Sequence, residues 1–160
     1  MAVVIGYFYF NKEVSGLKWL MSLLPLAGGL AVSLQAVING RLGRRVGTIE
    51  ASFISFSIGT LALLFLVIFL GKGNFLAAMV VPKWQLIGGL LGAVYVLIMV
   101  LVVPKLGVAS TMMAVIAGQI IMGAIIDHFG LFGGKQIPLD LKRIIAIVLF
   151  FGAIYLFNKK

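Results

Sequence analysis

Cysteine is absent from this 160-residue sequence, and histidine occurs only once, as His128. Disulfides and cysteine-ligated metals are therefore excluded, and a single histidine cannot form a histidine metal cluster. Charge is scarce as well, since Asp, Glu, Lys and Arg make up 11% of the chain, against about 25% in a soluble domain. We expect no metal site and no cofactor, and too little charge for a water-facing surface.

Acidic residues are the rarest charges, with four Asp and Glu against thirteen Lys and Arg, a net charge of +9. Such an excess can indicate nucleic-acid binding. Here the basic residues occupy short hydrophilic gaps between apolar runs, which is typical of membrane-flanking charge. We therefore expect the lipid bilayer as a partner and no nucleic acid.

Apolar residues dominate the composition: 62% of the chain is hydrophobic and the mean hydropathy is +1.21. A bilayer core requires runs of about 20 apolar residues. Five runs meet this requirement, at residues 17–39, 49–70, 84–103, 107–126 and 141–157. The pattern predicts an all-α integral membrane protein, with a single five-helix transmembrane domain over residues 18–160.

The first 17 residues are predicted to form a peripheral N-terminal extension. Their apolar stretch, residues 1–10, is too short to span a membrane. It also lacks the basic start and the small-residue cleavage site of a signal peptide.

Positive charge normally marks the cytoplasmic side of a membrane protein. With five spans, seven basic residues lie on the side of the N-terminus: Lys12, Lys18, Lys72, Lys83, Lys135, Lys142 and Arg143. Six lie on the other side: Arg41, Arg44, Arg45, Lys105, Lys159 and Lys160. This near-tie suggests dual topology, in which copies insert in both orientations and pair antiparallel. The alternative is that local context fixes one orientation.

Polar side chains within the spans predict a cavity. Gln35 and Asn39 are four residues apart and share one helix face. We expect a polar cavity lined by Gln35, Asn39, Ser55, Tyr95 and Gln119. Hydrogen bonding between helices is the alternative interpretation, especially for the hydroxyls. Gln119 favours a binding role, because a buried amide has several donors and acceptors to satisfy.

Four glycines within the spans predict close helix packing: Gly59, Gly88, Gly92 and Gly118. Small residues allow helix backbones to approach each other in a membrane. The Gly88-xxx-Gly92 spacing is one such motif.

Ionisable residues occur only near the predicted span ends. Glu50 follows Thr48, which we expect to cap the second helix, and an acid in a first turn is favoured by the helix dipole. Asp127 and His128 lie at the end of the fourth helix. We interpret them as capping and turn residues, and a role in coupling or gating is the alternative. Because no carboxylate lies at mid-membrane, coupling would use Glu50 or Asp127, or transport is uncoupled.

Several motifs together resemble one family. These are LQAVINGRLG at residues 34–43, SFSIGT at 55–60, GGLLGAVY at 88–95 with Trp84 before it, PKLG at 104–107, Gly118-Gln119, and DHFG at 127–130. Over residues 18–157 the chain resembles the YdcZ-type family, a small branch of the drug/metabolite transporter superfamily. The resemblance implies a multi-pass protein of the bacterial inner membrane.

The resemblance also bears on assembly, since larger members of the superfamily contain two inverted five-helix repeats. The chain therefore resembles half of an inverted-repeat fold, which requires a second copy or a paralogous partner. Inverted repeats around a midplane site are a general transporter design.

The expected function is secondary transport of a small organic molecule by an antiparallel dimer with a polar cavity between the halves. A non-transporting scaffold or accessory subunit is one alternative. A small channel is another, although no selectivity-filter sequence is present. We do not expect an enzyme, because the sequence lacks a catalytic His/Asp/Glu cluster or a Ser/His/Asp set.

Overall fold

A computed structural model describes the backbone of residues 2–159, and the side chains of Trp19, Met21 and residues 23–159. This part of the chain contains helices and no strands. The five long helices are α1 (Ala2–Val46), α2 (Thr48–Leu70), α3 (Gly88–Leu106), α4 (Val108–Phe129) and α5 (Leu141–Asn158). Three short 3-10 helices lie in the connections: η1 (Phe75–Met79), η2 (Lys83–Ile87) and η3 (Leu131–Gly133).

Among the described residues, five helical segments are long and apolar enough to cross a membrane: Leu23–Val46, Thr48–Leu70, Lys83–Leu106, Val108–Phe129 and Leu141–Asn158. The prediction of an all-helical membrane protein with five spans is therefore confirmed. Large apolar side chains are exposed along all five segments. Such a surface suits contact with lipid hydrocarbon and is unfavourable in water.

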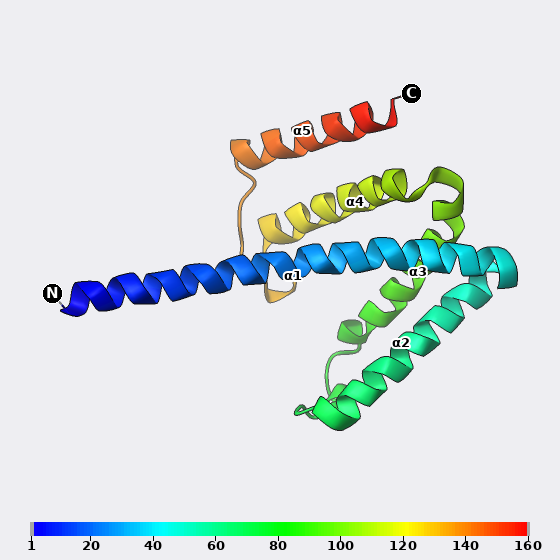
Figure 1. Ribbon diagram of the computed structural model, residues 1–160, viewed down its shortest axis with the longest axis horizontal. Helices are drawn as coiled ribbons and strands as arrows, with labels where there is room; N and C mark the ends of the chain where they lie inside the picture. The colour runs from blue at the N-terminus through cyan, green and yellow to red at the C-terminus, as the bar shows by residue number, and fades with distance from the viewer. Residues whose placement is uncertain (1, 160) are drawn as a thin grey trace.

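The helix α1 is the axis of the arrangement (Figure 1). The start of α2 and the end of α3 lie near the C-terminal end of α1, and both helices diverge from α1 toward their other ends (Figure 1). The helices α4 and α5 lie on the other side of α1. Contacts join α1 to α2, α3 and α4, whereas α5 contacts α4 alone among the described helices. The fold is thus a core of three helices with a looser pair attached.

The first span is part of a longer helix than the apolar run predicts. With 45 residues, α1 has a length of about 68 Å at 1.5 Å per residue, more than twice the thickness of a hydrocarbon core. Its backbone is continuous from Ala2, so no break separates the predicted extension from the span. The peripheral location of residues 1–17 stays a prediction.

Single glycines replace two of the predicted gaps. Residues 40–48 and 104–106, which separate the predicted spans, are helical up to Val46 and Leu106, so Gly47 and Gly107 alone form the links. Their φ angles of 105° and 84° lie in the region that favours glycine. Both boundary predictions were wrong because helices tolerate the basic residues of a last turn.

The two links are tied together at one end of the molecule. Arg44 donates a hydrogen bond from Nη2 to the carbonyl oxygen of Pro104, at 3.2 Å. That carbonyl belongs to the last turn of α3, where backbone acceptors lack helical partners. The contact therefore satisfies a free carbonyl and joins the end of α1 to the end of α3.

The start of α2 corrects another prediction. Its N-cap is Gly47, without a side-chain cap, and Thr48 is the first helical residue. The prediction that Thr48 caps the helix was wrong, because the one-residue link leaves only Gly47 in the cap position. Glu50 does lie in the first turn of α2, as predicted.

A strip of small residues on α1 brings α1 and α3 together. A Cβ atom added at Gly40 would lie 3.1 Å from Cγ of Pro104, and one added at Gly43 would overlap Cγ1 of Val100. Val100 is 2% exposed and belongs to one of two small buried clusters. Both glycines are therefore interior residues of α1 that allow α3 to approach, and neither of them ends the helix.

Candidate functional site

A groove of about 520 Å³ lies between α1, α2 and α3. Gly59 is the central residue of α2, and Gln35 and Tyr95 lie near the middle of their own spans. The groove therefore lies near the middle of all three membrane-spanning segments. Its lining is Val32, Gln35, Ser55, Phe56, Gly59, Thr60, Leu63, Gly89, Gly92, Tyr95 and Val96.

The groove brings together three of the five predicted cavity residues, one from each helix: Gln35, Ser55 and Tyr95. Asn39 lies behind them, 6% exposed, and donates from Nδ2 to Oγ of Ser55 at 2.9 Å. Such bonds between membrane helices are worth about 0.6 kcal/mol on average. Asn39 thus holds the hydroxyl that lines the groove.

The hydroxyl of Tyr95 is buried and has no hydrogen-bond partner among the described residues. Its ring packs against both buried clusters, which fixes its position on α3. A buried polar group without a partner costs about 1–3 kcal/mol. The hydroxyl is therefore a donor and acceptor left unpaired within the described part of the single chain.

Two of the four predicted packing glycines line the groove. A Cβ atom at Gly92 would lie 3.3 Å from Cζ of Phe56, whereas one at Gly59 would meet nothing within 4 Å. A Cβ atom at Gly88 or Gly118 would also meet nothing within 4 Å. Close packing within the chain is thus seen at Gly92, and the roles of the other three stay predictions.

Gln119 does not line this groove. It is exposed on α4, close to the middle of that span. A single chain therefore does not bury this amide, and its predicted binding role would require a second chain.

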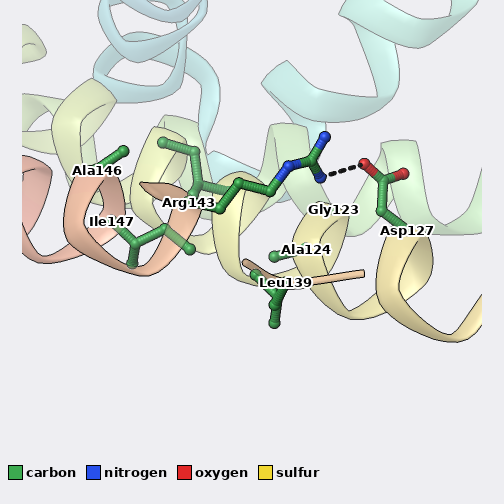
Figure 2. Close-up of a pocket in the computed structure, with 8 residues that line it drawn as sticks. Gly123, Ala124, Asp127, Leu139, Arg143, Ala146 and Ile147 are labelled. Atoms are coloured by element: carbon green, nitrogen blue, oxygen red, sulfur yellow. Dashed lines mark ion pairs between the residues drawn. The ribbon is translucent and has the colours of Figure 1, made fainter. Parts of the chain in front are cut away.

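A second hollow, of about 330 Å³, lies between α4 and α5. Figure 2 shows Arg143 reaching from α5 across this hollow to Asp127 on α4, and their Nη1 and Oδ2 atoms are 3.6 Å apart. Both side chains are more than 40% exposed, and exposed pairs contribute about 0–1 kcal/mol. Ile120, Ala124 and Ile147 make the hollow largely apolar.

The segment after α4 is fixed by hydrogen bonds to its last turn. The backbone N–H of Leu139 donates to Nδ1 of His128 at 3.1 Å, and Nε2 of Gln136 donates to the carbonyl of His128 at the same distance. The N–H of Ile137 donates to the carbonyl of Asp127 at 2.7 Å. These contacts agree with a turn role for Asp127 and His128, and their gating role stays a prediction.

The remaining ionisable candidate, Glu50, is exposed and does not line the groove. Its proposed part in coupling stays a prediction. Within the part of the chain that the structure describes, no group of three His, Asp or Glu side chains could hold a metal ion.

Residues 20–156 match the sequence model of a protein family described as "Putative inner membrane exporter, YdcZ". The chain belongs to the YdcZ family. The match includes all five spans almost completely, so the resemblance seen in the motifs is confirmed. This YdcZ-family chain is a multi-pass protein of the inner membrane. Its family is described as one of exporters, that is, of transporters rather than enzymes. No curated protein and no solved structure matches it.

Sequence reasoning missed several residues that build the groove of this YdcZ-family chain. Phe56, Thr60 and Gly89 line it, yet apolar and small residues are too common in membrane helices to stand out. The packing strip of Gly40 and Gly43 was missed as well. Its signal is the spacing of Ala36, Asn39, Gly40 and Gly43, which places four small or polar residues on one helix face.

Proposed function

We propose that this chain is one half of an exporter that moves a small organic molecule through the groove between α1, α2 and α3. The observation that carries the proposal is the position of the groove, at mid-depth and lined by polar groups from three helices. Transporters built from inverted repeats bind their substrates near the bilayer midplane. Membership of an exporter family supports the same conclusion.

We propose that a second copy completes the site. The amides of Gln35 and Gln119 are both exposed near mid-depth in a single chain, where hydrocarbon offers no hydrogen-bond partners. Gly118, beside Gln119, has open space around it and would allow a second helix to approach closely. Association through these faces would remove both amides from hydrocarbon.

The second copy would be inverted in the membrane. The near-tie of basic residues, seven against six, supports insertion in both orientations. Within one copy, α2 and α3 are held at the glycine links and diverge from α1 at the other end (Figure 1). In an antiparallel pair, each side of the membrane would carry the glycine links of one copy and the diverging helix ends of the other. Exchange of the two conformations would then expose the groove to alternate sides.

Locked orientations test the dimer. The changes Lys72→Gln, Lys83→Gln, Lys135→Gln and Lys142→Gln reduce one side from seven basic residues to three, against six on the other. The changes Arg41→Gln and Arg45→Gln reduce the other side from six to four, against seven. Each variant therefore carries an excess of three basic residues on one side. We expect each variant to insert in one orientation and lose efflux, and the two expressed together to restore it. C-terminal reporters verify the orientations. Full efflux by either variant alone would refute the antiparallel pair.

Blocking the groove tests the transport path. The change Gly59→Leu adds a side chain in open space within the groove, so the fold should survive while efflux is lost across a panel of labelled small metabolites. Gly28→Leu is the matched control, because Gly28 is also unhindered and lies outside the groove. Equal efflux by the two variants would argue against this path.

A further inference from the structure

We infer that the groove binds uncharged molecules with an apolar body and a hydrogen-bond acceptor, and discriminates against organic cations and anions. This inference rests on the proposed function, because it assigns a substrate class to the same site. It starts from the side chains that line the groove. None of its eleven lining residues is Asp, Glu, His, Lys or Arg.

The rest of the chain supplies no charge at this depth either. Residues 23–40, 51–70, 88–104, 108–126 and 144–158 contain no Asp, Glu, His, Lys or Arg. The charged groups of the groove-forming helices lie toward the span ends: Arg41 near the end of α1, Glu50 in the first turn of α2 and Lys105 in the last turn of α3. Asp127 and His128 lie at the end of α4. The middle of every span is therefore free of formal charge.

A second copy cannot change this result. An antiparallel pair related by a two-fold axis in the membrane plane places mid-depth against mid-depth. Whatever face the second copy presents to the groove, its residues at that depth are the same uncharged ones. An ionic ligand would then lie in a low-dielectric site without a counter-ion, which is strongly unfavourable.

The polar groups of the groove can pair with an acceptor on the ligand. The hydroxyl of Tyr95 lacks a partner among the described residues, and the amide of Gln35 and the hydroxyl of Thr60 can also donate. A carbonyl oxygen in the groove would accept from Gln35 or Thr60, whose side chains are exposed there. Val32, Phe56 and Leu63 form the apolar walls, which suit an aliphatic or aromatic body.

The volume agrees with a molecule of moderate size. The groove of one copy measures about 520 Å³, within the range of about 300–1,000 Å³ that small-molecule sites occupy. A substituted aromatic amide has the required body, size and carbonyl acceptor.

Three benzamides that differ in the charge of one substituent test the inference. 4-tert-Butylbenzamide is neutral, 4-(trimethylammonio)benzamide is its cationic isostere, and 4-carboxybenzamide is an anion. The full-length protein in lipid nanodiscs carries 3-fluorotyrosine, and the ¹⁹F signal of Tyr95 is assigned from its loss in Tyr95→Phe. Tyr155 on α5, outside the groove and 66% exposed, reports non-specific partitioning of the ligand into lipid.

We expect the neutral amide to shift the Tyr95 signal saturably, and both ions to bind at least ten-fold more weakly. The Gly59→Leu variant should abolish the saturable shift while the Tyr155 signal behaves as before. Cation binding as tight as that of the neutral amide would overturn the inference. A Tyr95 shift that never saturates and follows the Tyr155 shift would overturn it as well.

Efflux measurements separate this inference from the proposed function. Groove-dependent efflux of the cation without preference for the neutral amide would retain the exporter and overturn the ligand class. Selective binding of the neutral amide, without efflux of any compound in the panel, would support the ligand class and refute the exporter.

Discussion

The change Gly43→Ala tests whether α1 and α3 are held by backbone approach. Its added methyl group would overlap Cγ1 of Val100, a β-branched side chain with restricted rotamers that is 2% exposed. Overpacking of this kind costs about 1–3 kcal/mol. Replacing a helical glycine by alanine returns about 0.5–1 kcal/mol. We therefore expect a net loss of about 1–2 kcal/mol in the free energy of unfolding.

Gly28→Ala is the matched control on the same helix. A Cβ atom at Gly28 meets nothing within 4 Å, so the substitution should stabilise the protein by about 0.5–1 kcal/mol. The two alanine variants should thus differ by about 2 kcal/mol when unfolding is followed by helicity in an SDS titration of mixed micelles.

A second-site change identifies the cause of the loss. Val100→Ala removes the atom that the new methyl would meet, so Gly43→Ala should cost little in that background. A double-mutant cycle then measures a coupling of about 1 kcal/mol or more, as expected for residues in contact. The reasoning is refuted if Gly43→Ala is as stable as Gly28→Ala, or if the cycle shows no coupling.

Three further changes examine other contacts. Asn39→Ala removes the 2.9 Å bond to Ser55 and should lower the SDS midpoint by the equivalent of about 0.6–2 kcal/mol; no change would show that this bond contributes nothing. Asp127→Asn breaks an exposed pair with Arg143, so stability should fall by less than about 1 kcal/mol and efflux should persist; loss of efflux without loss of stability would instead assign Asp127 to coupling. Gly107→Ala places a side chain at φ 84° and should reduce stability by about 1–2 kcal/mol, whereas a higher melting temperature would contradict the observed link.

The existence of the spans could be predicted from the sequence, because repeated apolar runs of bilayer length are typical of membrane helices. Two of their ends could not be predicted. Gly40 and Gly43 read as the start of a gap, yet they continue α1 and pack against α3. A sequence does not distinguish a small residue that ends a helix from one that lets another helix approach.

The sequence predicts how far along each span the polar residues lie, but not which neighbouring helices they face. The polar residues Gln35, Ser55, Tyr95 and Gln119 all lie near mid-span, and their depth follows from counting residues. Only the first three face one groove, because the rotation of each helix about its axis is set by packing against its neighbours. Gln119 shows this limit, since it has the right depth on a helix that presents it elsewhere.

The glycine links also have a consequence for how the protein is made. Only Gly47 separates α1 from α2, and only Gly107 separates α3 from α4. Because these links are so short, the two helices of each pair would have to insert into the bilayer together. We expect the ribosome to deliver two ready hairpins to the insertion machinery, followed by α5 alone. Each hairpin would then take its orientation as a unit, set by the basic residues at its linked end and in the connections at residues 71–87 and 130–140.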